Sequence, residues 1–182
     1  MTATPASERC FFALWPDPAT RARCAQVART LTDLGGRLVA AENLHITLSF
    51  LGSIHASQRA CAEGAADAVQ APPLTLTLHR LGYFAKPKAV WLGAEVTPSA
   101  LLALTAALNQ RVGECGIILD PRPFALHMTL LRNASGPPLL EVAPLITWQV
   151  QSFSLVNSTT RSSGPIYRVI RTWSLDQGQH KD

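Results

Sequence analysis

The sequence predicts an α+β fold with mostly antiparallel strands, arranged as one domain over residues 1–182. Hydrophobic residues make up 47% of the 182-residue chain, which is long enough to bury a core. Short apolar or alternating segments typical of strands are interspersed with longer segments of helical periodicity. The connections between them are short, which favours antiparallel pairing, and no linker divides the chain.

The first third of the chain alternates strands and helices. Residues 9–15, RCFFALW, are aromatic and apolar and stop at a Pro-Asp-Pro sequence, which predicts a strand. From residue 17 to 34 the apolar and small residues keep helical spacing, and two glycines then end the helix. A short strand is expected at 37–39. A second helix is expected at 57–69, with Ser57 as its N-cap.

The rest of the chain continues the mixture. Residues 74–80, LTLTLHR, alternate strictly between apolar and polar, the clearest pattern of a half-buried strand in the protein. Another strand is expected at 89–96, and Pro98 opens a helix with one apolar stripe, formed by Leu101, Leu104, Leu108 and Val112. After a Gly-Pro-Pro loop, a weak helical stretch precedes two final strands near 148–156 and 166–175.

The charge balance is basic, with 16 Lys and Arg residues against 12 Asp and Glu, a net charge of +4 and a pI near 9.2. Thirteen of the basic residues are arginines, and a guanidinium group binds phosphate oxygens through two parallel hydrogen bonds. A phosphate-bearing partner and an ordinary solvated surface both fit this composition.

The cysteines are widely spaced, with no Cys-x-x-Cys pair and no histidine at metal-ligand spacing beside them. We therefore expect no metal site, and four reduced thiols that pack as small hydrophobic side chains in a reducing compartment. The N-terminus has no secretory signal pattern, and no run of 18 apolar residues could span a bilayer. These observations predict a cytoplasmic protein that does not enter a membrane.

One five-residue pattern, Leu-His-x-Thr-Leu, occurs twice, as LHITL at 44–48 and LHMTL at 126–130. In a strand, residues two apart point to the same side. His45 and Thr47 therefore share one face, as do His127 and Thr129, while the leucines face the core. If the two polar faces meet across a groove, four reactive groups converge on one small volume. Two hydrogen-bonded structural histidines are the alternative. The order strand, helix, strand, motif strand recurs, which predicts two similar lobes.

With these motifs the chain resembles the two-histidine phosphoesterase superfamily, and in detail its RNA 2',3'-cyclic phosphodiesterase branch, also called 2'-5' RNA ligase. The segments that carry the resemblance are CFFALWP, NLHITLSFLG, KAVWLG, FALHMTLLR, SFSLVNST and GPIYRVIRTWSL. The sequence departs from the family pattern at Leu126, where proline is frequent, and at Leu131, where a small residue is frequent. The resemblance implies a bilobal fold, with two pseudo-symmetric antiparallel sheets, helices outside and a central cleft.

The resemblance also implies that His45 is the proton donor and His127 the proton acceptor, whereas the residues alone identify the pair but not the roles. Neutral and charged histidine coexist near neutral pH, as both tasks require. Thr47 and Thr129 can donate hydrogen bonds to phosphoryl oxygens. Arg132 matches the family arginine that contacts the phosphate. Five residues past His127, a regular strand would turn it away, so the strand must end or bulge there; a surface arginine is the alternative.

The expected function is metal-independent hydrolysis of RNA 2',3'-cyclic phosphodiester ends to 2'-phosphomonoesters, without a cofactor, by a cytoplasmic monomer. Microscopic reversibility adds a 2'-5' ligation. Three alternatives stay open: a phosphodiesterase acting on 2'-5' linked or other nucleotide-derived cyclic phosphates, a non-catalytic module that binds RNA ends, and a structural protein in which the repeated motif is a coincidence. Phe11 and Tyr167 are candidates for stacking on a base or ribose.

Overall fold

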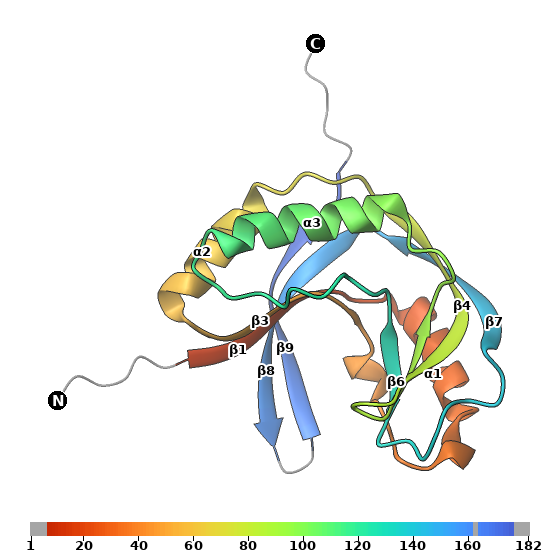
Figure 1. Cartoon of the computed structure of the whole chain (residues 1–182). Coiled ribbons are helices and arrows are strands. Elements are labelled where there is room, and N and C mark those ends of the chain that lie inside the picture. Colours follow the sequence, from red (N-terminus) through yellow and green to blue (C-terminus); the bar gives the residue numbers. More distant parts are fainter. Residues whose placement is uncertain (1–6, 162–163, 177–182) are drawn as a thin grey trace.

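The computed structural model describes residues 7–161 and 164–176 (Figure 1). Within these residues the strands are β1 (Ser7–Leu14), β2 (Arg37–Leu38), β3 (Ile46–His55), β4 (Leu74–Phe84), β5 (Ala89–Gly93), β6 (Met128–Arg132), β7 (Val142–Val150), β8 (Ser152–Arg161) and β9 (Gly164–Ser174). The helices are α1 (Pro18–Arg29), α2 (Ala56–Asp67) and α3 (Ser99–Gly113), with short 3-10 turns η1 (Thr32–Leu34) and η2 (Ala41–Asn43). The predicted α+β class is confirmed.

All strands belong to one bent antiparallel sheet in the order β7-β4-β5-β6-β3-β1-β8-β9, and β2 pairs with the outer part of β6. The sheet has two halves, because β6 and β3 are in register at a single pair of residues, Ile46 and Met128. Figure 1 shows the strong curvature of the sheet between the half with β4 and β7 and the half with β1, β8 and β9. Each half supplies one motif strand, β3 on one side and β6 on the other, as the predicted pair of lobes requires.

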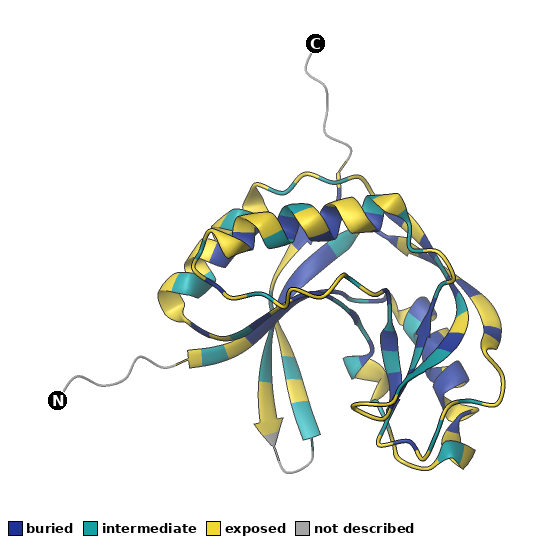
Figure 2. Ribbon diagram, viewed as in Figure 1, coloured by how far each residue is buried: buried dark blue, intermediate teal, exposed yellow. Residues whose placement is uncertain are grey.

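The halves are not consecutive stretches of sequence. After β1 the chain crosses to the other half, where α1 packs against β6 and β7, and it returns to form β3. Helices α2 and α3 pack on each other and on β3, although β4 and β5, which lie between them in sequence, belong to the other half. Figure 2 shows the outer helix α3 with buried and exposed positions along its length. Its predicted apolar stripe is buried as expected.

Three local predictions are wrong. The weak helical stretch and the first part of the predicted strand 148–156 are one strand, β7, which pairs with β4 and whose buried positions alternate from Ile146 to Val150. A break at Gln151 then separates β7 from β8. Helix α2 starts two residues earlier than predicted: His55, not Ser57, is the N-cap, and its backbone N–H donates to the Gln58 side chain at 3.1 Å. In β7, long-range pairing with β4 overrides a weak local preference. At the start of α2, the local contact between His55 and Gln58 decides the N-cap.

The expectation of four reduced cysteines is also wrong, because Cys61 and Cys115 form a disulfide. Their Cα atoms are 5.7 Å apart, and the bond joins α2 to the turn after α3 across a sequence separation of 54 residues. Packing of α2 on α3 brings the two residues together, which no spacing rule could reveal. Cys10 and Cys24 are buried free thiols, as predicted, and burial raises the pKa of each to about 11.

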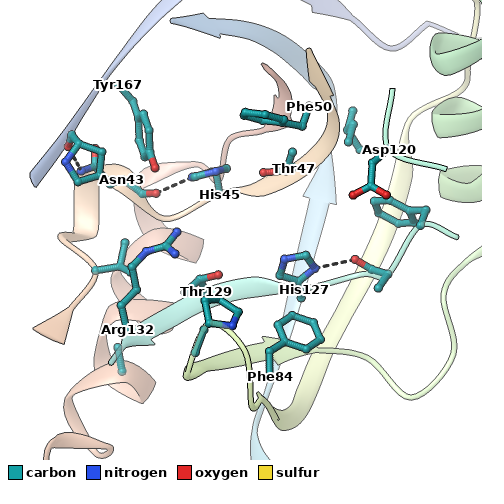
Figure 3. Close-up of a pocket in the computed structure, with 18 of the residues that line it drawn as sticks. Asn43, His45, Thr47, Phe50, Phe84, Asp120, His127, Thr129, Arg132 and Tyr167 are labelled. Carbon is teal, nitrogen blue, oxygen red and sulfur yellow. Dashed lines mark hydrogen bonds between the residues drawn. The ribbon is translucent and has the colours of Figure 1, made fainter. Parts of the chain in front are cut away.

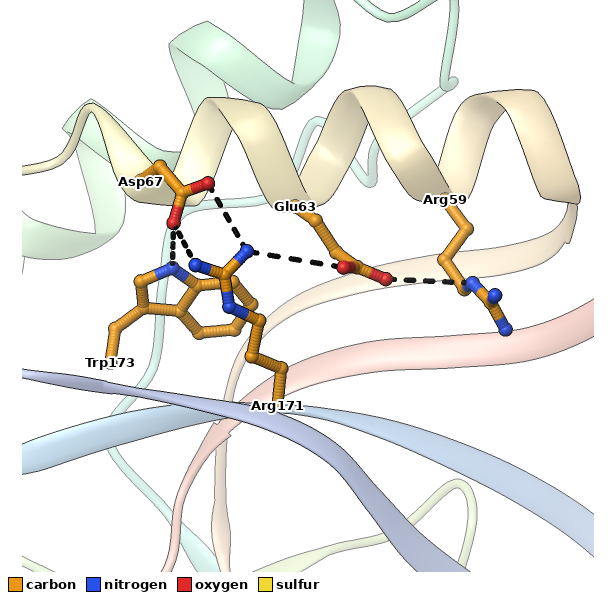
Figure 4. Close-up of polar contacts among 5 residues, drawn as sticks. All are labelled: Arg59, Glu63, Asp67, Arg171 and Trp173. Carbon is orange, nitrogen blue, oxygen red and sulfur yellow. Dashed lines mark hydrogen bonds and ion pairs between the residues drawn. The ribbon is translucent and has the colours of Figure 1, made fainter.

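A polar cluster ties α2 to the outermost strand β9 (Figure 4). The Asp67 carboxylate accepts a hydrogen bond from the Trp173 indole N–H at 2.8 Å and pairs with Arg171. The indole bond is the largest cause of the lowered pKa of Asp67. Glu63 lies between Arg171 and Arg59. Each exposed ion pair contributes little to stability. The main contribution of the cluster is therefore the hydrogen bond that gives the buried indole N–H of Trp173 an acceptor.

No helix in the described part of the chain is both long and apolar enough to cross a membrane.

Candidate active site

A cleft of about 940 Å³ opens between the two halves of the sheet. Its lining includes all five residues selected from the sequence: His45 and Thr47 from the first motif, and His127, Thr129 and Arg132 from the second. Figure 3 shows the two motif strands facing each other, with the two imidazole rings projecting into the space between them. Residues that are 82 positions apart in sequence therefore share one volume.

The junction of the two halves explains how the motifs meet. Ile46 and Met128, the residues after each histidine, pair across the antiparallel junction, and both side chains are completely buried. Because side chains alternate along a strand, the histidine and threonine on either side of each buried residue point to the opposite face. That face is the cleft, and an antiparallel pair relates the two motifs by a local two-fold axis. The apolar residues of each motif thus hold the polar ones over the cleft.

A β-bulge turns Arg132 into the cleft. Strand β5 pairs Val90 with Leu131 but Trp91 with Thr129, so Leu130 is an extra residue in β6. Leu130 and Leu131 are consequently both buried, at 0% and 1% exposure. The extra residue reverses the alternation beyond it. Arg132 therefore lies on the same face as His127 and Thr129, which a regular strand would not allow.

The same irregularity occurs in the first motif. Strand β1 pairs Phe12 with Ser49 but Ala13 with Thr47, so Leu48 is the extra residue, three positions after the histidine, as Leu130 is in β6. The two motif strands therefore share not only their sequence pattern but also their distortion.

Each histidine is oriented by the same type of hydrogen bond. The Nδ1 atom of His45 is 2.6 Å from the carbonyl oxygen of Asn43, and the Nδ1 atom of His127 is 2.8 Å from that of Ala125 (Figure 3). A carbonyl oxygen only accepts, so each Nδ1 carries the hydrogen. In the neutral ring Nε2 is then the unprotonated nitrogen, the atom that can accept or later return a proton. In each case the residue whose carbonyl oxygen orients the ring precedes the histidine by two positions.

His45 sits in an aromatic box that sequence reasoning missed in part. Trp15 stacks on its ring at a centroid distance of 5.2 Å and an interplanar angle of 5°. Phe11 lies at 4.9 Å, and Tyr167 meets the ring edge-on at 5.1 Å. The prediction that Phe11 could stack on a base is wrong, because that ring is only 4% exposed and contacts His45 and Tyr167. Trp15 had no pattern to mark it beyond its place at the end of a predicted strand.

Burial in this box lowers the pKa of His45 to about 4. The hydrogen bond to Asn43 opposes this shift, and the charges of Arg132 and His127 add to it. Burial also lowers the pKa of His127. Among the described residues its one ring neighbour is Phe84, at a centroid distance of 5.1 Å in an edge-on contact. Both rings are therefore neutral at pH 7.

The cleft carries a positive excess. Among the described residues, the basic side chains of the cleft lining are Arg29, Arg37, Lys86, Arg122 and Arg132. The one acidic side chain of this lining is Asp120. Asp120 is paired with Arg122, whose hydrogen bond is the largest cause of lowering the pKa of Asp120 to about 2. Within the described residues no group of three His, Cys, Asp or Glu is placed to hold a metal ion. The cleft thus offers two proton-transfer groups and cationic side chains, the requirements of a phosphate ester reaction.

Comparison with known proteins gives consistent matches. The sequence model of the family described as "2'-5' RNA ligase superfamily" matches residues 14–161. The RNA 2',3'-cyclic phosphodiesterase of Escherichia coli is 35% identical over 144 residues, covering 78% of this chain and 81% of that protein. A protein of the same name from Thermus thermophilus is 29% identical over 185 residues, covering 94% and 92%. The crystal structure of E. coli LigT in apo form superposes with a TM-score of 0.87 at 31% identity, over 94% of this chain and 99% of the other.

Proposed function

The chain belongs to the 2'-5' RNA ligase superfamily, and from this membership we propose that its cleft hydrolyses RNA 2',3'-cyclic phosphodiester ends to 2'-phosphomonoesters. The observation that carries the proposal is the junction itself, which holds two histidines with unprotonated Nε2 atoms over one cationic cleft. The relatives from E. coli and Archaeoglobus fulgidus bear the name RNA 2',3'-cyclic phosphodiesterase, and E. coli LigT has been crystallised with 3'-AMP. The reverse reaction of the same site would be a 2'-5' ligation.

The reaction needs one proton acceptor and one proton donor on opposite sides of the phosphorus atom. His127 Nε2 accepts a proton from water, and the water oxygen forms a bond to phosphorus. The bond from phosphorus to the ribose 3'-oxygen breaks, and His45 Nε2 transfers its proton to that oxygen. The products are a 2'-phosphomonoester and a free 3'-hydroxyl, with one proton moved from His45 to His127 overall. Both tasks are met by this chain's own side chains, so we propose no cofactor and no metal.

The donor must be protonated before it can act, and burial holds the pKa of His45 at about 4. A bound phosphate anion supplies the missing charge partner, because a negative group beside an imidazolium raises its pKa. The face of Trp15 also favours a cation stacked on it. We propose that substrate binding charges His45, whereas His127 stays neutral and acts as base. Activity then depends on pH through two groups of the complex, and its pH profile is bell-shaped.

The other predicted residues stabilise the charge that develops on phosphorus. The hydroxyls of Thr47 and Thr129 donate to the non-bridging oxygens, and the β-branch of threonine keeps each hydroxyl in a fixed direction. Arg132 offers a permanent positive charge from the same face of β6. Each of these roles is proposed from the position of the side chain in the cleft.

The test is to incubate the protein with adenosine 2',3'-cyclic phosphate in excess chelator and to identify the product by phosphorus NMR. We expect adenosine 2'-phosphate. His45→Ala and His127→Ala should each abolish turnover, while His79→Ala, a histidine outside the cleft lining, should leave it unchanged. Turnover that stops with the chelator, or a product with a 3'-phosphate, would contradict the mechanism.

A non-catalytic module that binds RNA ends is the second candidate, since the cationic cleft alone would serve it. Two groups able to change protonation favour the enzyme, because binding a phosphate does not require them. Binding of the cyclic phosphate without product would establish the module instead. We also propose that residues 1–182 act as one domain and as a cytoplasmic monomer, since one chain completes the cleft. Gel filtration and cell fractionation test these statements.

A further inference from the structure

The two carbonyl groups that orient the histidines are supported differently. Asn43 and Ala125 occupy the same place in the two motifs, two positions before the histidine. The methyl side chain of Ala125 cannot form a hydrogen bond, whereas the Asn43 amide donates one from Nδ2 to the carbonyl oxygen of Pro165 at 3.2 Å. This bond joins residues 122 positions apart. The repeated motif is therefore symmetric in sequence, but only its first copy has this side-chain anchor.

The acceptor of this bond lies on the outer edge of the sheet. Pro165 is the second residue of β9, the last strand in the sheet order, and it pairs with Thr160 of β8. Proline has no N–H and is tolerated where that side of an edge strand faces away from the ladder. The N–H and C=O of one residue in an antiparallel strand point to the same side, so the Pro165 carbonyl also faces away from β8. The Asn43 amide supplies a donor that no strand among the described residues supplies there.

Asn43 ends a turn that needs such support. η2 is a single 3-10 turn of three residues, in which the backbone N–H of Asn43 donates to the Ala40 carbonyl oxygen at 2.8 Å. Hydrogen-bond geometry is poorer in 3-10 turns than in α-helices, so a turn this short is held largely by its surroundings. η2 packs on α1, in the half of the molecule with β6 and β7. The Asn43 side chain fastens the end of the turn to β9, in the other half.

Strand β9 also contacts the ring of His45 directly. Tyr167 follows Pro165 by two positions, and its ring meets that of His45 edge-on at a centroid distance of 5.1 Å. Figure 3 shows Asn43 and Tyr167 next to His45, with the hydrogen bond between the Asn43 carbonyl and the imidazole. One strand thus fixes the ring through Tyr167 and the acceptor of the ring through Asn43. A continuous chain of hydrogen bonds runs from Pro165 through Asn43 to Nδ1 of His45.

A fixed acceptor at Nδ1 is needed most by a proton donor. An imidazolium ring has two N–H groups, and a carbonyl that binds the one at Nδ1 leaves the one at Nε2 to be transferred. If the carbonyl moves away, the charged ring loses the partner that sets its direction. The neutral ring is then also able to carry its hydrogen on Nε2 instead of Nδ1.

We propose that Asn43 is a positioning residue for the proton donor. Its side chain fixes η2 to β9, and its carbonyl thereby holds the imidazole of His45 with Nδ1 toward the turn and Nε2 toward the phosphate. This inference rests on the proposed function in one respect, because it takes His45 as the donor. It goes beyond that function by assigning the orientation of the donor to a residue that touches no reacting atom.

The kinetic test replaces Asn43 with leucine, which is similar in size and has no N–H to donate. Gln58→Leu is the matched control, because it removes another amide-to-carbonyl hydrogen bond of 3.2 Å, to Gly116, and neither of these residues lines the cleft. With adenosine 2',3'-cyclic phosphate, Asn43→Leu should lower kcat on the order of 100-fold, the loss that a displacement of about 1 Å can cause. Gln58→Leu should leave kcat unchanged. Calorimetry should show that both variants bind adenosine 2'-phosphate like wild type.

Long-range 1H–15N NMR spectra of the imidazole rings at pH 7.5 measure the tautomer without any turnover. In wild type and in Gln58→Leu, His45 should carry its hydrogen on Nδ1. In Asn43→Leu the signals of His45 should shift toward the Nε2–H tautomer, while those of His127 stay the same in all of these proteins. Asn43→Ala removes the same donor with a smaller side chain, and it should show the same shift even if leucine prevents folding.

An unchanged tautomer of His45 in the Asn43 variants would overturn the proposal, as would an equal loss of kcat in Asn43→Leu and Gln58→Leu. Weaker binding of adenosine 2'-phosphate at an unchanged kcat would also overturn it, because Asn43 would then be a substrate-binding residue. If the wild type hydrolyses no cyclic phosphate, the proposed function fails. The tautomer spectra still decide in that case whether Asn43 orients His45.

Discussion

His45 should make the protein sensitive to mild acid, and His45→Gln should remove this sensitivity. The ordinary pKa of histidine is about 6.5, and burial among three rings lowers that of His45 to about 4. Between these values the unfolded chain binds a proton at His45 that the folded protein does not. The unfolded state is therefore favoured progressively as pH falls through this window, and the stability that the neutral ring allows is complete only above pH 6.5.

The size of the effect follows from the shift. A difference of about 2.5 pKa units corresponds to roughly 3 kcal/mol of unfolding free energy, lost between about pH 6.5 and pH 4. Glutamine is similar in size and does not titrate, so the variant lacks this contribution. His127 and the carboxylates titrate in both proteins and cancel in the comparison.

Urea unfolding, followed by circular dichroism at pH 7.5 and at pH 4, measures the effect. Wild type should lose about 3 kcal/mol more than His45→Gln over this range. A parallel loss in the two proteins would refute the reasoning, because it would mean that His45 is as hydrated when folded as when unfolded. Adding adenosine 2'-phosphate should reduce the difference, since an anion beside the ring raises the pKa of His45.

Three other changes test the site and the framework. Arg132→Gln should lower kcat about 100-fold or more without unfolding the protein, as expected for loss of one charge-stabilising donor; an unchanged kcat would place this arginine outside the reaction. Thr47→Val and Thr129→Val keep the shape but remove the hydroxyl, and each should lower kcat/KM by about 10-fold or more, whereas an effect on melting temperature alone would make the hydroxyls structural. Replacing Cys61 and Cys115 by serine should cost about 2–4 kcal/mol in urea unfolding, because the disulfide closes a loop of 54 residues; the same loss should appear in wild type treated with dithiothreitol, and equal stability in all samples would contradict the argument.

Elements with a strong local period were predictable. The stripe of α3 and the alternation of β4 need only 3.6- and 2-residue spacing, and both elements are where the sequence places them. The first part of β7 was not predictable, because Pro144 and exposed Leu145 interrupt its period and its pairing partner β4 lies far away in sequence. The Cys61–Cys115 disulfide depends on how two helices pack, and sequence spacing carries no information about that.

The candidate site was likewise predictable from the sequence only in part. Two repeated motifs, each with polar residues two apart between buried ones, determine by themselves which four side chains leave the core, since alternation is a property of any strand. Even the need for a bulge before Arg132 follows from counting residues. Only the tertiary structure decided that the strands meet at Ile46 and Met128 and that Trp15 stacks on His45. These are contacts between residues far apart in the chain, and the packing of the whole sheet, not any local preference, selects which of them form.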